Sequence, residues 1–304
     1  MELNVLYNVH HELAIGTLIA IYFYFVGLHA GCSIVSITAT LIGKDEYKPV
    51  AKIGAIAVII LFSIAPIFLI VDLEQPLRFW YLFIRFNPSS PISWGTFFLI
   101  AYPIATTIYI IYLFMDNIPM SKLWGAISLP LAIGVHGYTG FILGMGKARV
   151  LWNTAIMPGY FLSSAMVSGI ALMIIIAIIR HYVIRGRLSP EQRETDFTLI
   201  IRLTQAMAAF IAVNLFYVFS DIVIMYTHTE DAYVTVELVR FGKFGFLYMW
   251  VDNFLGNAIP LAVVLTPWVR KHLPTLAFVS LLALVGVYVM RYVLVIGGQY
   301  IPQT

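Results

Sequence analysis

Residues 156–182 read IMPGYFLSSAMVSGIALMIIIAIIRHY, and no charged side chain interrupts this run before Arg180. An α-helix needs about 20 mostly apolar residues to cross the hydrocarbon core of a bilayer. The run exceeds that length, and Pro158 near its start is typical of the first turn of a helix. This stretch therefore predicts a membrane-spanning helix.

Seven further runs have the same character. They cover residues 13–41, 51–71, 93–115, 122–144, 198–226, 243–267 and 272–296. Over the whole chain, 61% of residues are hydrophobic and 11% are charged, whereas a soluble domain has about 25% charged residues. The period-two alternation of barrel strands is absent. We therefore predict an all-α integral membrane protein, a bundle of about eight transmembrane helices that forms one transmembrane domain over residues 1–304.

The basic residues predict an orientation, because Lys and Arg concentrate on the cytoplasmic side of membrane proteins. The first, third, fifth and seventh connections, with their helix ends, hold 11 of the 18 basic residues. This places both termini outside, together with the long connections 72–92 and 227–242. No Lys or Arg precedes Lys44, so we expect no secretory signal peptide and a first span that stays in place.

Four ionisable side chains inside the predicted spans stand out: Asp221, Asp252, Arg291 and His136. Such groups are costly in lipid and are functional candidates by default. One interpretation is mutual satisfaction, with Arg291 paired to Asp221 or Asp252. The other is a track that carries protons to or from a redox site, with Asp252 and Asp221 allowing proton uptake from the inside. A transporter or channel with a midplane site at Asp252, Asn253 and Asn257 is the alternative function.

Bound metal is not expected. Cys32 is the only cysteine, so the thiolates of an iron–sulfur cluster would have to come from another polypeptide. His29 and His136 would differ in depth by roughly 12 Å, which argues against a pair of haem ligands. We find no pattern for nucleotide or nucleic acid. Any electron transfer would then need a lipid-soluble two-electron carrier and a redox partner at the surface.

Several motifs go further than composition. They are DLEQPLRFW at 72–80, FNPSSPISWG at 86–95, YTGF at 138–141, RVLWN at 149–153 and the weaker Arg291-Tyr292 with Gly297-Gly298-Gln299. The first two follow each other between the second and third spans. Together with eight spans, they resemble the NrfD/polysulfide reductase membrane family over essentially the whole length.

The resemblance implies a subunit of a respiratory oxidoreductase complex in the cell membrane. Such a subunit anchors a ferredoxin-like iron–sulfur subunit and a catalytic, molybdopterin-containing subunit on the outer face. It exchanges electrons with menaquinone or a related quinone. The protein is then a quinone-site subunit or a purely structural, non-catalytic anchor.

The resemblance also suggests residues for each role. For quinone binding they are Tyr138, Tyr22, His11 and His136. For proton transfer they are Asp72, Asp252, Asp221 and Arg291. For partner docking they are Arg78, Trp80, Arg149 and Trp152. Packing in a helix groove remains the alternative for Tyr138, and an ion pair with Arg78 the alternative for Asp72. Ile19 and Tyr22 stand where polysulfide reductase has an Asn and a His.

Overall fold

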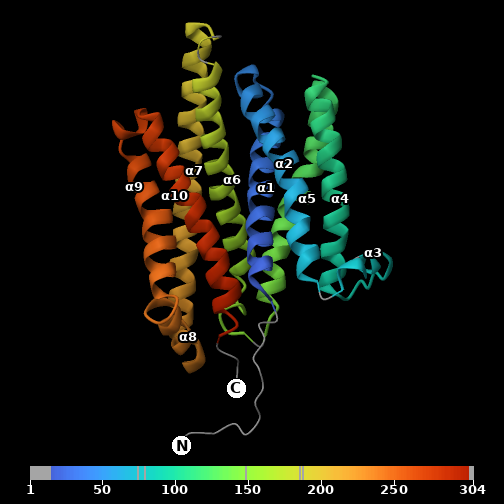
Figure 1. Cartoon of the computed structure of the whole chain (residues 1–304), viewed down its shortest axis with the longest axis vertical. Helices are drawn as coiled ribbons and strands as arrows, with labels where there is room; N and C mark the ends of the chain where they lie inside the picture. The colour runs from blue at the N-terminus through green and yellow to red at the C-terminus, as the bar shows by residue number, and fades with distance from the viewer. Residues whose placement is uncertain are drawn as a thin grey trace, which may run out of the picture.

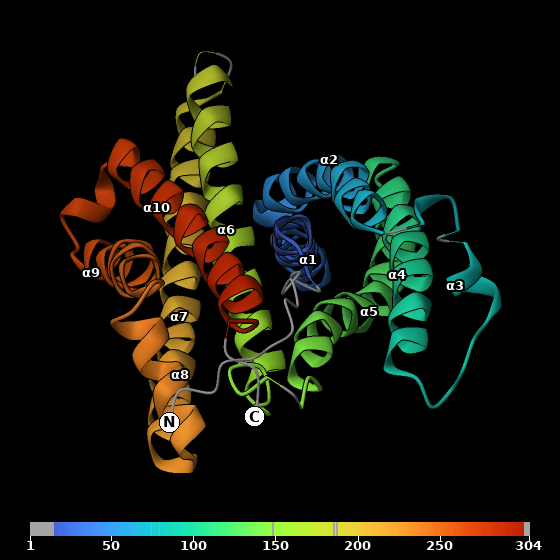
Figure 2. The ribbon, with the colours of Figure 1, turned by 60° about the horizontal axis from the view of Figure 1, so that its bottom comes forward.

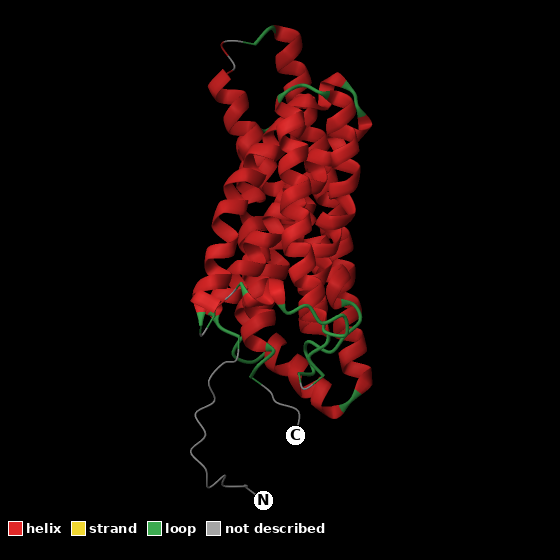
Figure 3. Ribbon diagram, turned by 90° about the vertical axis from the view of Figure 1, so that its right-hand side faces the viewer, coloured by secondary structure: helices red, strands yellow, loops and turns green. Residues whose placement is uncertain are grey.

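A computed structural model describes residues 15–300, apart from 74, 79, 148, 185 and 187. This described part is a bundle of long helices without a β-strand (Figure 3). Eight of its helical stretches are long and apolar enough to cross a membrane. The predicted helical class and the predicted number of spans are therefore confirmed.

The elements follow the predicted order, with additions in the connections. The long helices are α1 (Thr17–Ile42), α2 (Lys48–Asp72), α4 (Pro91–Phe114), α5 (Ile118–Gly144), α6 (Met157–Ile184), α7 (Pro190–His228) and α10 (Leu273–Tyr292). The remaining span joins a π-helical segment, Phe246–Ala258, to α9 (Ile259–Leu265), and a second π-helical segment, Val293–Gly297, extends α10. Short α3 (Tyr81–Ile84) and α8 (Glu230–Arg240), which the sequence did not predict, lie at the same end of the bundle as the first and last described residues (Figure 1).

Helix α1 stands at the centre of the bundle. It packs against α2, α5 and α6, and Figure 2 shows these three helices around it. Helix α4 covers α5 on one side, and α7, α9 and α10 gather beyond α6 on the other (Figure 2). His29, Ser33, Ser36 and Thr40 of α1 are therefore shielded from lipid by neighbouring helices, whereas Thr38 is exposed.

The contact between α1 and α6 is a backbone contact. A Cβ atom on Gly169 of α6 would lie 2.6 Å from the Cα atom of Gly31 in α1. The Cys32 thiol donates to the Gly169 carbonyl oxygen at 3.4 Å. Small residues permit such close packing between membrane helices, where dispersion rather than the hydrophobic effect holds helices together. Gly31 and Gly169 therefore set how near α1 can come to α6.

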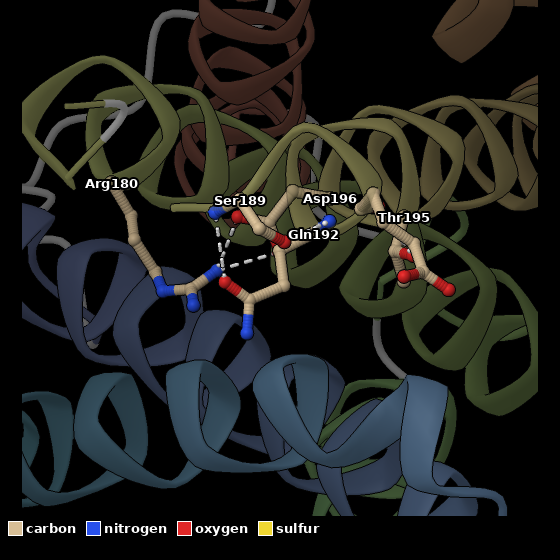
Figure 4. Close-up of polar contacts among 6 residues, drawn as sticks. Arg180, Ser189, Gln192, Thr195 and Asp196 are labelled. Atoms are coloured by element: carbon tan, nitrogen blue, oxygen red, sulfur yellow. Dashed lines mark hydrogen bonds and ion pairs between the residues drawn. The ribbon is translucent and has the colours of Figure 1, made fainter. Parts of the chain in front are cut away.

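At the end opposite the termini, α6 and α7 extend beyond their apolar runs. Ser189 and Gln192 form a capping box in which each side chain bonds the other residue's backbone N–H. Arg180 donates to both carboxylate oxygens of Asp196, at 3.0 and 2.9 Å (Figure 4). Helix α7 consequently begins at Pro190, well before the predicted residue 198, because the cap satisfies the first backbone N–H groups.

We predict that Gly169→Ala destabilises the bundle. The added methyl group must push α1 and α6 apart, and overpacking of this kind costs about 1–3 kcal/mol. The measurement is the midpoint of unfolding of the purified protein in mild detergent. Gly137→Ala is the matched control, because a Cβ atom there meets nothing within 4 Å. Equal midpoints for both variants would contradict the assignment of this contact.

Candidate functional site

The Tyr138 side chain reaches from α5 onto the first turns of α4. A Cβ atom on Gly95 would overlap both the ring and the hydroxyl of Tyr138. Glycine at position 95 is therefore what lets the phenol lie against the α4 backbone. Two of the motifs thus meet here, because Gly95 closes the 86–95 run and Tyr138 opens the 138–141 run.

Tyr138 lines a cavity of about 550 Å³, a size typical of small-molecule sites, between α4, α5 and the start of α6. We call it the α5 cavity. Its walls are almost wholly apolar. They include Pro88, Trp94, Phe98, Ile133, Phe141 and Pro158.

Tyr22 lines a different cavity, of about 160 Å³, between α1, α2 and α4. We call it the α1 cavity. Its walls include His29, Phe62, Pro66, Leu99, Tyr102 and Pro103. Pro66 and Pro103 lie inside α2 and α4 and interrupt their hydrogen-bond ladders at this depth. Tyr22 and Tyr138 are close enough to influence each other electrostatically, and each lines its own cavity.

His136 does not line either cavity. In a helix, residues two apart point in widely different directions, so the ring of His136 faces α6 and α10 while Tyr138 faces α4. Its Nε2 atom lies 2.8 Å from the Phe161 carbonyl oxygen and 3.2 Å from Nη2 of Arg291. The structure therefore brings His136 together with Arg291 rather than with Tyr138.

Arg291 is fully buried and does not form the predicted ion pair. Its Nη2 atom donates to the Phe161 carbonyl oxygen at 3.0 Å and to the Ser164 hydroxyl at 2.7 Å. The guanidinium also lies 3.7 Å from the centre of the Phe161 ring. Among the described residues, no carboxylate comes within ion-pair distance of Arg291. The expected pairing to Asp221 or Asp252 is wrong, because Nη2 is directed at α6 while Nε and Nη1 have no hydrogen-bond partner among the described residues.

Asp252 lies in the π-helical segment and is fully buried. The Asn257 amide donates to Oδ1 of Asp252 at 3.0 Å. The Asn214 amide donates to Oδ1 of Asn257 at 3.2 Å. Asn214 in turn accepts from the Ser163 hydroxyl at 3.0 Å. The other carboxylate oxygen of Asp252 has no partner in the described part of the protein. A buried acid of this kind, in a π-helical segment of a membrane bundle, is a functional candidate.

Asp221 and Tyr160 extend this polar cluster toward the termini. Tyr160 lies within electrostatic range of Asp252, Asp221 and Arg291. Asp221 lines a third cavity, of about 320 Å³, with Asn153 and Thr154 of the connection before α6. The track through Asp252 and Asp221 therefore approaches the end of the bundle that carries the termini. The sequence predicts proton uptake from the inside along this track, whereas Asp221 borders the opposite end.

Asp72 ends α2 beside the start of α1. Its Oδ1 atom lies 3.1 Å from where a Cβ atom on Gly16, the N-cap of α1, would stand. A carboxylate is stabilised near a helix N-terminus by the helix dipole. Asp72 makes no ion pair with the exposed Arg78 in the described structure, so the alternative pairing is not observed.

The four predicted docking residues divide into two pairs. Arg78 and Trp80 are exposed, and Trp80 stacks on Tyr81. Trp152 is buried and donates to the Leu294 carbonyl oxygen at 2.6 Å. Its ring fills the interior, so the docking role assigned to the Trp152 side chain is wrong.

Arg149 has a similar structural function. It donates to the Gln299 carbonyl oxygen at 2.8 Å. Gln299 also bonds the backbone of Ile15 and of Val295. Arg149 and Trp152 thus fasten the connection before α6 to the end of the last helix, and Gln299 ties in the start of α1. His11 lies outside the described residues.

Sequence reasoning missed His29, Tyr102 and Gly95 as parts of the site. The sequence presents His29 only as a possible haem ligand, and Gly95 only as a motif position. The available signal was the spacing of small polar residues after His29, at positions 33, 36 and 40. That spacing places them on one face of α1.

Comparison with known proteins identifies relatives of this protein. It is 24% identical to a selenate reductase subunit of Mesobacillus selenatarsenatis, over 94% of its own length and 74% of that protein. It is 25% identical to the Hdr-like menaquinol oxidoreductase integral membrane subunit of Archaeoglobus fulgidus, over 92% of its own length and 69% of that protein. It is 28% identical to a polysulfide reductase chain of Wolinella succinogenes, over 92% of its own length and 93% of that protein.

The sequence profile of the family described as polysulphide reductase, NrfD matches residues 7–303. That match takes in all eight candidate spans and both residues of the Gly95–Tyr138 contact. The chain is therefore an integral membrane protein that belongs to the polysulphide reductase NrfD family.

Proposed function

We propose that this protein exchanges electrons between a membrane quinone of the menaquinone type and an iron–sulfur partner subunit. A catalytic subunit with molybdopterin completes the complex. Two observations on relatives support this proposal. One relative is named as a menaquinol oxidoreductase subunit, and others are named as single subunits of reductases, so they have companion subunits.

The contact of Tyr138 with Gly95 carries the proposal. It holds a phenol at the wall of a large apolar cavity that a flat, lipid-soluble ring would fit. Tyr22 lines the smaller α1 cavity. A quinone bound here would supply two-electron, two-proton chemistry. The Tyr138 hydroxyl is placed to hydrogen-bond a carbonyl of such a ring, and apolar walls exclude water from it.

We assign proton transfer to Asp72, Asp221 and Asp252, with Arg291 as a positioning residue beside them. Asp72 lies beside the start of α1 and can exchange protons with the surface at that end. The buried Asp252 and its neighbours connect toward the cavity at Asp221. Arg291 fixes His136 and the α6 backbone beside this cluster, so its own role is positioning. His11 keeps its assignment to quinone binding as an expectation from the sequence.

The partner subunits dock at the end of the bundle that carries the termini. Arg78, Trp80 and the exposed Leu77 form an apolar and basic surface there, on the connection between α2 and α4. The distribution of basic residues supports an outward orientation for both termini and for this docking face. The protein acts as one transmembrane domain, with lipid around it and no nucleic acid.

We predict that Tyr138→Phe lowers quinol-dependent turnover of the purified complex by about tenfold, because a lost hydrogen bond to substrate costs on the order of 1.5 kcal/mol. Gly95→Ala should reproduce the loss with Tyr138 intact, because the added methyl group displaces the phenol. The measurement is turnover with menadiol, together with quinone extracted per complex. Tyr182→Phe, at a half-exposed residue far along α6, is the control. Full activity in both Tyr138→Phe and Gly95→Ala would mean that the protein is a structural anchor with no quinone site at Tyr138.

We predict that Asp252→Asn slows quinol-dependent turnover by at least about tenfold, because the amide cannot accept a proton while proton transfer contributes about 10²-fold or more. The amide oxygen can still accept from Asn257, so the fold is retained. Asp231→Asn, at an exposed residue of α8, is the control. Unchanged turnover would remove Asp252 from the proton track.

The same variant tests a transport function at Asp252, Asn253 and Asn257. These residues lie in a π-helical segment, and such segments are frequent at functional sites. Uptake of a cation into liposomes by this protein alone, lost in Asp252→Asn, would support transport in place of redox chemistry.

A further inference from the structure

A row of polar side chains runs along α1 from its middle to its far end. His29, Ser33, Ser36 and Thr40 are spaced three or four residues apart, so they share one face of the helix. Each is no more than 8% exposed. These residues lie at the depth of the hydrocarbon core, where buried polar groups are costly and are typical of proton relays.

Helix α4 faces this row with hydroxyls of its own. The Tyr102 hydroxyl lies 3.2 Å from Nδ1 of His29 and adjoins the hydroxyls of Ser33 and Thr106. The Thr106 hydroxyl lies 2.6 Å from that of Ser128 on α5. We call these α1 residues, together with their hydroxyl partners on α4 and α5, the polar row. Its first half therefore begins at an imidazole and continues through four hydroxyls.

Tyr109 of α4 joins the second half. Its hydroxyl lies 2.9 Å from the Ser36 hydroxyl and 2.8 Å from the Thr40 hydroxyl. Ser36 and Thr40 also reach backbone carbonyl oxygens, of Ala51 and Ser36. Hydroxyls both donate and accept, so these bonds can run in either direction along the row. Helix packing needs only the bonds from Ser36 and Thr40 to carbonyl oxygens. The Tyr109 hydroxyl additionally links Ser36 to Thr40.

Two steps of the row exceed hydrogen-bond distance, from Tyr102 to Ser33 and from Ser33 to Ser36. Ser33 and Ser36 are three residues apart, a rise of about 4.5 Å along the helix. The Ser33 hydroxyl has no partner within hydrogen-bond distance in the described structure, so it has a free donor and acceptor for these steps. A single water molecule can bridge such a distance.

The near end of the polar row opens into the α1 cavity. Nε2 of His29 is buried, has no partner among the described residues, and belongs to a side chain that lines this cavity. The other nitrogen of the same ring faces Tyr102. An imidazole can take a proton on one nitrogen and release one from the other, so His29 can connect the cavity to the hydroxyls.

The far end reaches the charged end of the bundle opposite the termini. Thr40 precedes Gly43, and Lys122 of α5 packs against Gly43. Nearby, Lys52 of α2 pairs with the exposed Asp116 at 3.0 Å. The polar row thus runs from the α1 cavity to the end of the bundle opposite the termini. The track through Asp252 and Asp221 leads to the other end.

We propose that the polar row conducts protons between the α1 cavity and the end of the bundle opposite the termini. This inference rests on the proposed function. Oxidation of one quinol to quinone releases two electrons and two protons, and reduction takes up the same number. The electrons pass to or from the iron–sulfur partner at the terminal end. At least one proton travels along His29, Tyr102, Ser33, Ser36, Tyr109 and Thr40, in addition to the route assigned to Asp72, Asp221 and Asp252. The electrons and this proton therefore leave on opposite sides of the membrane.

The test uses the purified complex in liposomes with pyranine trapped inside, menadiol as donor and external ferricyanide as acceptor. Ferricyanide does not cross lipid, so only complexes with the partner outside turn over, and their polar row then ends at the lumen. Valinomycin with potassium removes the membrane potential. The readout is the rate of lumenal acidification, compared with the rate of ferricyanide reduction.

Tyr109→Phe removes the bridging hydroxyl and leaves Ser36 and Thr40 bonded to their carbonyl oxygens. Ser33→Ala tests the first half independently, because it removes the hydroxyl between Tyr102 and Ser36 on this route. We expect lumenal acidification to fall by at least about tenfold in each, with extracted quinone unchanged. Tyr24→Phe is the control, because this phenol of α1 packs on Tyr288 away from the row.

Lumenal acidification at the wild-type rate in both variants would overturn the proposal, as would a wild type that oxidises menadiol and releases every proton outside. A wild-type complex that reduces ferricyanide from menadiol no faster than protein-free liposomes do would overturn the proposed function itself. The two failures are therefore distinguishable.

Discussion

The backbone contact between Gly31 and Gly169 is the constraint on which the arrangement around α1 depends. It brings α1 against α6 with no side chain between them, so α1 occupies the centre of the bundle. From that place α1 offers Tyr22 and His29 to one cavity and a row of hydroxyls to α4. The same close approach puts Gly27 against the ring of His136. A larger residue at either glycine would shift every one of these groups together.

The interior also holds a charge without a counter-ion in bonding distance among the described residues. Arg291 is bound instead by a carbonyl oxygen, a hydroxyl and an aromatic face. Burial of a charge in lipid costs several kcal/mol unless hydrogen bonds replace its hydration. These contacts hold α10 to α6 at one depth and order His136. They also leave Asp252 free of a direct ion pair, which a residue that exchanges protons requires.

Polar groups in this bundle divide between its two ends. The cluster of Asp252, Tyr160 and Asp221 leads toward the end with the termini, where the connections carry Arg78 and Trp80. The polar row of α1 and α4 leads to the other end. The polar row begins beside the α1 cavity, which Tyr22 and His29 line. A redox site at that cavity would release protons along the polar row on the side away from the electron-accepting partner.

The sequence by itself determined the helical class, the eight spans and the family motifs, because hydropathy and motif spacing are properties of consecutive residues. It also singled out Asp252 and Arg291, since ionisable residues stand out in apolar runs, and the family resemblance singled out Tyr138. Only the tertiary structure decided what each one contacts. Arg291 meets α6 instead of an aspartate, Trp152 is buried instead of exposed, and His136 faces away from Tyr138. The reason is that the rotation of each helix about its axis is set by contacts such as Gly31 with Gly169 and Gly95 with Tyr138, and these join residues far apart in the sequence.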